Sequence, residues 1–230
     1  MGLREQQQDE RRRRILDAAR HLIRKGGPAG LAMRELAREA GVGLVTPYNL
    51  FGGKGGILHA LLVESVDDTE RRIGKLSTLA PVELAFAMVD CAVDHETEDP
   101  EYGRALLRAL WEQGDLQLTP QIWGRCIDGM TEVLRRAKAA GDLATSIRED
   151  LLARQQFFDY MIALEAWSNG LLCAEGLRAQ CRYGLALALA AAASEASREA
   201  HREALLACQR ALSSALDGRG SKPLEHASPL

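Results

Sequence analysis

The chain has 230 residues, of which 47% are hydrophobic and 27% are charged, and its formal net charge is −3. This length and apolar content suit packed cores in one small and one larger domain. No apolar run approaches the roughly 20 residues that span a bilayer, and the first ten residues lack the apolar stretch of a secretory signal. Five cysteines without CxxC spacing favour neither a disulfide framework nor a zinc site. We therefore expect a cytoplasmic protein with no membrane segment, metal or cofactor.

The charge is divided unevenly along the chain. Residues 1–60 contain 11 lysines and arginines against 6 acidic residues, a balance of +5, whereas the remainder has 18 against 26, or −8. A basic amino-terminal domain attached to an acidic remainder favours a DNA-binding protein with a separate regulatory domain, because cationic side chains neutralise phosphates. The run from Arg11 to Arg14 is compatible with a grip on the DNA backbone and equally with a solvated helix start.

The first predicted helix is amphipathic and ends at a breaker over residues 25–28, KGGP. Its apolar face comprises Ile15, Ala18, Ala19, Leu22 and Ile23. Residues 33–54, MRELAREAGVGLVTPYNLFGGK, then predict two short helices joined by a tight turn. Gly41 is expected to end the first of them in a left-handed conformation, and Val42 to anchor the turn.

The second short helix should begin near Leu44 and carry chemically mixed outward side chains. These are Thr46, Pro47, Tyr48 and Asn49. A hydroxyl, a rigid ring, a phenol and an amide suit phosphate oxygens and base edges better than a core. A further helix starts at Ile57 and has no clear boundary before Ser77. Its first apolar residues should pack on the DNA-binding helices that precede it, while the same helix continues towards the regulatory domain. These residues are Ile57, Leu58, Leu61 and Leu62.

Residues 11 to about 66 resemble the DNA-binding domain of the tetracycline-repressor (TetR) family of transcription regulators. The segments ILDAARHLI and MRELAREAGV carry the resemblance, with the spaced set Thr46, Tyr48, Phe51 and Lys54. The family usually opens the first short helix with a hydroxyl residue, but Leu31 and Ala32 occupy that region here, so a cap and a phosphate contact are missing. Pro47 replaces a commoner aliphatic residue and is tolerated within the first helical turn.

The resemblance implies that the second short helix lies in the major groove and that Tyr48 and Lys54 reach phosphates. Arg34 and the neighbouring helix start would contact the backbone as well. The residues assigned to DNA binding are Arg34, Leu44, Val45, Thr46, Pro47, Tyr48, Asn49 and Lys54. Double-stranded operator DNA is therefore the expected partner.

Beyond residue 66 the pattern is a succession of helices separated by short breakers. Helices are predicted over 82–94, from 100 to Trp111, from Thr119-Pro120 to Gly141, and over 195–216. No segment shows the period-two alternation of strands. The fold prediction is all-α: a flexible arm at 1–10, a three-helix helix-turn-helix domain at 11–66, a larger helical effector-binding and dimerisation domain at 67–216, and a disordered tail at 217–230.

Two later segments differ from ordinary surface helices. Residues 157–172, FFDYMIALEAWSNGLL, are apolar nearly all round and need partners on more than one side. The alanine-rich run from Leu185 to Ala193 permits close helix approach. We expect a four-helix bundle across the two-fold axis of a homodimer, as the family resemblance also implies, and the alternative is a monomer that uses both helices internally. The interface residues are assigned as Leu164, Leu171, Leu185 and Leu189.

The resemblance also implies a ligand pocket in the second domain. Aromatic and methionine side chains there favour a flat apolar or aromatic small molecule, although each residue taken alone is more typical of a core. The candidate lining residues are Met88, Trp111, Trp123, Cys126, Met130, Phe157, Tyr160, Met161 and Trp167. Acidic residues on the same segments, Asp128, Asp159 and Glu165, are candidates either for holding a polar group or for solvent exposure.

The sequence contains little evidence for a catalytic or metal-binding motif. The GGKGG at 52–56 lacks the preceding strand and the following Ser or Thr of a phosphate loop. His95 and Glu96 have no second histidine nearby, which favours a solvated acidic loop over a metal site. We predict a dimeric regulator without enzymatic activity, a repressor released from a palindromic operator by its effector. The alternatives are a helical small-molecule-binding protein or enzyme without a DNA role, and an architectural DNA-binding protein without an effector.

Overall fold

The computed structural model describes residues 2–113 and 120–218, which form ten α-helices and one isolated antiparallel bridge between Leu143 and Ala193. The all-α prediction is confirmed. The helices are α1 (Leu3–Gly30), α2 (Met33–Glu39), α3 (Val45–Phe51), α4 (Lys54–Gly74), α5 (Pro81–Thr97), α6 (Pro100–Gln113), α7 (Pro120–Ala139), α8 (Glu149–Ser168), α9 (Ala174–Ala192) and α10 (Arg198–Asp217).

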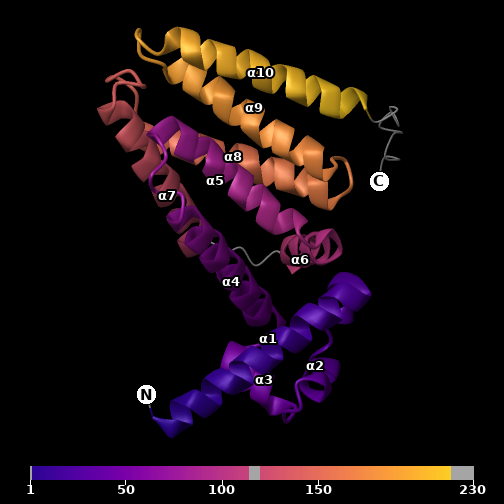
Figure 1. The fold of residues 1–230 in the computed structure, drawn as a ribbon. Helices are drawn as coiled ribbons and strands as arrows, with labels where there is room; N and C mark the ends of the chain where they lie inside the picture. Colours follow the sequence, from indigo (N-terminus) through magenta and orange to yellow (C-terminus); the bar gives the residue numbers. More distant parts are fainter. Residues whose placement is uncertain (1, 114–119, 219–230) are drawn as a thin grey trace.

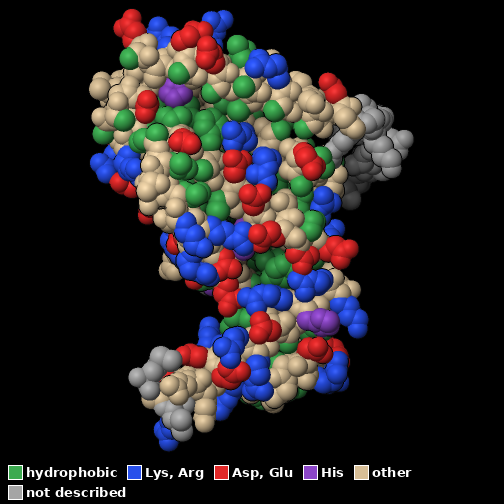
Figure 2. All heavy atoms as spheres, in the orientation of Figure 1, with side chains coloured by type: hydrophobic (Ala, Val, Ile, Leu, Met, Phe, Trp, Pro, Cys, Tyr) green, Lys and Arg blue, Asp and Glu red, His purple; other side chains and the backbone are tan. Residues whose placement is uncertain are grey.

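The helices form two units that α4 joins. Figure 1 shows α1, α2 and α3 at one end of the molecule and α5 and α7 to α10 at the other, with α4 running between them. No helix in the described ranges is long and apolar enough to cross a membrane. The space-filling view of Figure 2 shows hydrophobic side chains gathered on the upper unit, between charged ones, while Lys and Arg side chains mix with acidic ones over the lower unit.

The lower unit, which we call the reader, has its own core. Buried apolar side chains from α1, α2 and α4 meet there, and α6 adds a fourth side. The members are Ile15, Leu16, Ala18, Ala19, Ile23, Leu31, Leu36, Ala40, Ile57, Leu58, Leu61, Ala105, Leu106 and Ala109. Helix α6 lies outside the predicted 11–66 domain, so the reader is closed by a helix from the regulatory half of the sequence.

Helix α1 differs from the prediction at both ends. Residues 3–10, expected as a flexible arm, extend α1 towards the amino terminus, and Glu5 accepts a hydrogen bond from the amide of Gly2 at 2.8 Å. The glutamine, arginine and glutamate residues there are good helix formers. The predicted breaker acts as a kink, because Gly27 has φ 59° inside the helix, which continues to Gly30. The predicted tail residues 219–230 and Thr119 lie outside the described residues.

The upper unit contains the second core, and α8 lies in its middle between α6, α7 and α9. This position explains the all-round apolar pattern of α8 within a single chain. Three residues assigned to a dimer interface, Leu164, Leu185 and Leu189, are at most 3% exposed and belong to this core, so they are unavailable to a partner. The fourth, Leu171, is 59% exposed.

Candidate DNA-binding surface and effector cavity

The turn between α2 and α3 has the predicted geometry. Gly41 adopts φ 63°, its amide donates to the carbonyl of Arg38 at 3.2 Å, and the amide of Val42 donates to the carbonyl of Ala37 at 3.0 Å. These two bonds satisfy carbonyls at the end of α2 and reverse the chain within two residues. The cap missing from the sequence is missing here as well, since Ala32 precedes α2 without a side-chain hydrogen bond.

Helix α3 presents most of its assigned DNA-binding side chains to solvent. Val45 is 64% exposed, and Leu44 and Tyr48 are close to half exposed, although all three are large hydrophobic residues. Asn49 is exposed as well. Exposed apolar and amide groups on one short helix are a surface able to contact base edges. Pro47 is the exception: it is buried in the first turn of α3, so the expectation that it points outward is wrong.

The arginine run of α1 holds α3 in place. The guanidinium of Arg12 donates to the carbonyl of Leu50 at 2.8 Å and lies 4.4 Å from the ring centroid of Phe51. This cation therefore satisfies a carbonyl near the end of α3 and packs on its last residue. Arg11 and Arg14 are exposed on the same helix. One arginine of the run is thus structural, and two others remain available to a phosphate backbone.

The glycine-rich segment after α3 serves a tight connection. Gly52 ends α3 with φ 78°, and a Cβ atom on Gly56 would lie 1.7 Å from the carbonyl oxygen of Phe51. Only glycine permits this close approach of α3 to the first turn of α4. Lys54 begins α4 at this junction and is partly buried, and Arg34 is exposed on α2.

A cavity of about 420 Å³ lies between α4, α5, α6, α7 and α8. Eight predicted lining residues surround it: Met88, Trp111, Trp123, Cys126, Met130, Phe157, Tyr160 and Met161. The ninth, Trp167, does not. It is fully buried near the end of α8, where Gly103 of α6 leaves room for its ring and the guanidinium of Arg104 lies 4.9 Å from the ring centroid.

Aromatic and sulfur-containing side chains form one part of the wall. The rings of Trp123 and Phe157 lie 5.8 Å apart between centroids. Burial raises the pKa of the Cys126 thiol to about 11 and that of the Tyr160 hydroxyl well above its usual value. Both groups therefore stay protonated near neutral pH and add no charge to this part of the cavity.

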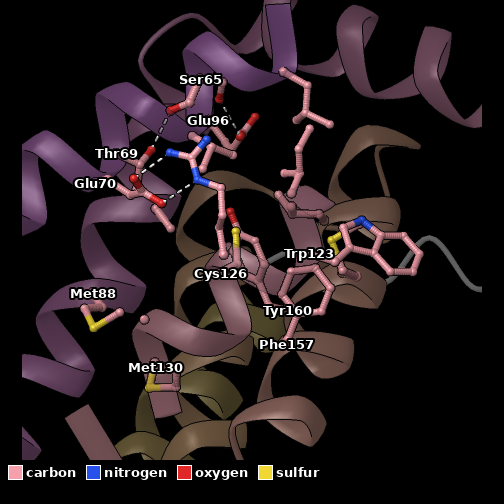
Figure 3. A pocket seen from close by; sticks show the side chains of 18 of the residues that line it. Ser65, Thr69, Glu70, Met88, Glu96, Trp123, Cys126, Met130, Phe157 and Tyr160 are labelled. Atoms are coloured by element: carbon pink, nitrogen blue, oxygen red, sulfur yellow. Dashed lines mark hydrogen bonds and ion pairs between the residues drawn. The ribbon is translucent and has the colours of Figure 1, made fainter. Parts of the chain in front are cut away.

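Polar residues line the part of the cavity bounded by α4 and α5, and the sequence analysis missed them. Figure 3 shows Ser65, Thr69 and Glu70 of α4 grouped with Glu96 of α5, apart from Phe157 and Met130. The Ser65 hydroxyl lies 3.5 Å from a carboxyl oxygen of Glu96, and burial raises the pKa of that carboxyl to about 7. The predicted solvated acidic loop is therefore wrong for Glu96, which lies in the last turn of α5 and faces the cavity.

Two further polar features lie at the wall, which also includes His59 of α4. Arg125 of α7 pairs with Asp67 and Glu70 of α4, each at 2.6 Å. Gln156 of α8 is 3% exposed, and neither atom of its amide has a hydrogen-bond partner in the described protein. A single polar residue on an otherwise apolar helix face is the only sequence signal that could have identified it. No cluster of metal-ligating side chains occurs within residues 2–113 and 120–218.

Helix α4 belongs to both sites. Ile57, Leu58 and Leu61 lie in the reader core, as predicted, whereas Leu62, which was predicted to pack there too, is not among the core residues and lines the cavity. The same helix lines the cavity from its first turn to its end, through Gly55, Leu58, His59, Leu62, Ser65, Val66, Thr69, Glu70, Ile73 and Gly74. Leu58 contributes to both. The expected shared element is therefore a continuous helix, and a change at the cavity wall acts directly on a helix that packs in the reader.

Comparison with known proteins supports this division. The family of bacterial regulatory proteins named tetR matches residues 15–61, which cover α1 from Ile15 to the first half of α4. A comparison with curated protein sequences gives no match.

Solved structures share the fold over most of the chain. SmeT, the repressor of the Stenotrophomonas maltophilia multidrug efflux pump SmeDEF, is 22% identical with a TM-score of 0.63, over 81% of this chain and 92% of SmeT. RolR in complex with resorcinol is 19% identical with a TM-score of 0.64, over 87% and 95% of the two chains. A gamma-butyrolactone receptor, ArpA-like, is 19% identical with a TM-score of 0.55, over 91% and 99%.

At these identities the solved structures show a common fold. The family match over residues 15–61 is the evidence that the reader is a DNA-binding domain. The turn at Gly41, the family match in the reader and the fold shared by the whole chain all support the same kind of protein. Residues 15–61 match the tetR family of bacterial regulatory proteins, and the chain shares its fold with SmeT over most of its length.

Proposed function

We propose that this protein is a homodimeric, cytoplasmic repressor that binds a palindromic operator and leaves it when an apolar or aromatic small molecule occupies the cavity. The tetR match over residues 15–61 supports a DNA-binding domain, and the fold shared with SmeT and with RolR in complex with resorcinol supports a helical ligand-binding domain. The observation that carries the proposal is α4, one helix that packs in the reader core and lines the cavity. SmeT, which has the same fold, is itself a repressor.

The outward face of α3 supports sequence-specific DNA binding. Asn49 offers an amide for a bidentate contact with adenine, and Val45 offers an apolar group for a thymine methyl. Tyr48, Lys54 and Arg34 supply groups suited to phosphates, which fix the register of a protein on the duplex. Readout and positioning groups therefore lie on adjacent helices, as a DNA reader requires.

An exposed apolar stripe on α8 supports a dimer. Leu151, Phe158 and Ile162 are separated by seven and four residues, so they lie on one helical face, and Ile162 is 66% exposed. Leu187 of α9 is exposed as well. Contiguous exposed apolar side chains on a soluble protein mark interaction surfaces. The interface proposed here uses this stripe and Leu171, while Leu164, Leu185 and Leu189 serve the protomer core.

The dimer explains how a ligand acts on DNA binding. Two recognition helices enter successive major grooves only when they lie about 34 Å apart. A ligand that shifts α4 changes this spacing and lowers operator affinity, and linkage requires that DNA weakens ligand binding by the same factor. We expect a coupling of about 5 to 150-fold, the usual range for allosteric sites.

The test begins with selection of DNA fragments by the purified protein, which gives the operator and its symmetry. Fluorescence anisotropy then measures operator affinity at several salt concentrations, with and without an aromatic compound identified by thermal shift. The same compound is titrated calorimetrically into protein and into the protein–operator complex. A ligand affinity unchanged by operator contradicts regulation through the cavity, and binding of all fragments with equal affinity supports the architectural alternative. Absence of salt-sensitive DNA binding supports the helical binding protein or enzyme.

A further inference from the structure

The cavity has two chemically different ends. In Figure 3, the polar group of Ser65, Thr69, Glu70 and Glu96 lies apart from the apolar side chains that α7 and α8 contribute. The apolar end contains the contacting rings of Trp123 and Phe157. A ligand that fills such a cavity has an apolar body and one polar group, and the identity of the polar group depends on the charges at the polar end.

The charges at that end leave one carboxyl without a cation. Arg125 lines the cavity, and its guanidinium already forms ion pairs with Asp67 and Glu70. Glu96 interacts with the Ser65 hydroxyl and takes part in no ion pair among the described residues. The nearby tyrosines of α6 and α8, Tyr102 and Tyr160, add no positive charge. The polar end is therefore negative whenever Glu96 is ionised.

Gln156 provides a second sign of an unmet interaction. Its side chain is 3% exposed and lines the cavity, yet both its oxygen and its nitrogen lack a hydrogen-bond partner in the described protein. Buried polar groups are normally hydrogen-bonded, because the desolvated group otherwise costs stability. A polar ligand supplies the missing partner, and the amide oxygen of Gln156 can accept a hydrogen bond from an N–H group.

These observations separate three classes of ligand. An anionic ligand meets the carboxyls of Glu70 and Glu96, and Arg125 is already paired with acidic residues. The imidazole of the wall, His59, lies six residues before Ser65 on α4, which is about 9 Å along the helix axis. A neutral ligand forms no charge pair with Glu96, which then binds a proton, as its raised pKa indicates. A cationic ligand supplies the missing charge, and the aromatic rings of the wall also attract cations through their faces.

Resting on the proposed function, we propose that the effector is a lipophilic amine whose protonated nitrogen pairs with the Glu96 carboxylate and whose apolar body lies against Trp123, Phe157 and Tyr160. Gln156 is the second hydrogen-bonding group of the site. The cavity volume of about 420 Å³ sets the size of this ligand to that of a small drug molecule. Glu96 thereby determines specificity for charge, and the aromatic wall determines specificity for shape.

The test uses three probes with one ring system and different charges: 1-naphthylmethylamine, 1-naphthylmethanol and 1-naphthoic acid. Calorimetry at neutral pH measures the affinity of the wild-type protein for each. We expect the amine to bind about 10 to 100-fold more tightly than the alcohol, which corresponds to one hydrogen-bonded charge pair, and the acid to bind most weakly. In Glu96→Gln the amine and the alcohol should bind with affinities within about threefold of each other.

Glu98→Gln is the matched control, because Glu98 lies directly after α5, is exposed and pairs with Arg72 outside the cavity wall. This variant should keep the full preference for the amine. Equal affinity of the wild-type protein for amine and alcohol, or failure of the amine to bind, overturns the proposal without any variant. Retention of the preference in Glu96→Gln, with its circular dichroism unchanged, overturns it too.

Operator affinity is measured in the same preparations, so the two proposals can fail separately. If the amine binds through Glu96 but leaves operator affinity unchanged, the charge assignment holds and regulation through the cavity is wrong. If the alcohol releases the operator and the wild-type protein shows no preference for the amine, regulation holds and the charge assignment is wrong.

Discussion

The reader and the upper unit use their apolar side chains in different ways. In the reader, α1, α2, α4 and α6 close on one another, and Ile15, Leu36 and Ile57 have no exposed surface. In the upper unit, the helices surround a cavity of about 420 Å³ and also leave Ile162 of α8 66% exposed. One unit is filled, whereas the other contains unfilled space inside and an uncovered face outside.

The difference follows from what each unit must hold. A recognition helix of seven residues has little stability of its own, so the reader has to fix α3 through a filled core and the contacts of Arg12. A ligand domain has to leave space, and side chains beside empty space forgo packing contacts. Ligand binding returns this stability, because a ligand that binds only the folded state stabilises it.

The largest expected effect tests which apolar face of α8 is internal. Leu164→Asp should prevent folding, since an unpaired carboxylate at a 3% exposed position costs more than about 4 kcal/mol. Ile162→Asp, two residues earlier on the exposed stripe, should leave the helical circular dichroism intact and dissociate the dimer. Sedimentation of both variants at micromolar concentration decides. A wild-type protein that is monomeric there and binds one half-site tightly contradicts the dimer proposal.

The second prediction compares truncations in the two units. Leu36→Ala in the reader core should lower the free energy of unfolding by about 2–5 kcal/mol, because it opens a new cavity. Met88→Ala, at a partly buried position on the cavity wall, should cost less than about 2 kcal/mol, because it enlarges space that already exists. Urea unfolding of each variant gives the values. Equal losses would mean that the cavity closes in solution.

The third prediction concerns the desolvated carboxyl. The pKa of Glu96 rises from its usual value of 4.5 to about 7 in the folded chain, with Ser65 of α4 as its hydrogen-bond partner and Tyr102 and Tyr160 facing it from α6 and α8. Between these two pKa values the folded state binds more protons than the unfolded state. Raising the pH over this range therefore lowers the free energy of unfolding. Glu96→Gln should remove this dependence. Its stability relative to wild type should rise by up to about 3 kcal/mol between pH 4.5 and pH 8.

Thermal or urea unfolding at four pH values measures that difference, and Glu98→Gln serves again as the exposed control. A difference between Glu96→Gln and wild type that stays constant with pH would show that Glu96 is solvated in the ligand-free protein.

The smallest expected effects separate the roles of residues on the reader surface. Asn49→Ala should change preference among operators by about 1–3 kcal/mol, as the loss of a base contact does. Lys54→Ala should weaken binding to all sequences alike and flatten the dependence on salt concentration by about one unit. Anisotropy on the selected operator and on single-base variants measures both. Unchanged binding by two correctly folded variants contradicts the docking of α3.

Much of the reader could be predicted from local sequence. The end of α2 depends on Gly41, whose left-handed conformation requires no information from the rest of the chain. The continuity of α4 also followed from the lack of a breaker between Ile57 and Ser77. Eight of the nine predicted lining residues lie at the cavity, because aromatic and methionine side chains on the helices of one unit tend to converge.

Only the tertiary structure decided which buried residues meet empty space, which meet other side chains and which would meet a partner. Trp167 and Phe157 lie on one helix, yet the ring of the first packs against Gly103 while the second faces the cavity. Leu164 and Ile162 are two residues apart on a helix that is apolar all round, and only the positions of α7 and α9 distinguish them. Helical periodicity states which side of a helix avoids water. It does not state what lies against that side, because cores, cavities and subunit interfaces favour the same apolar residues.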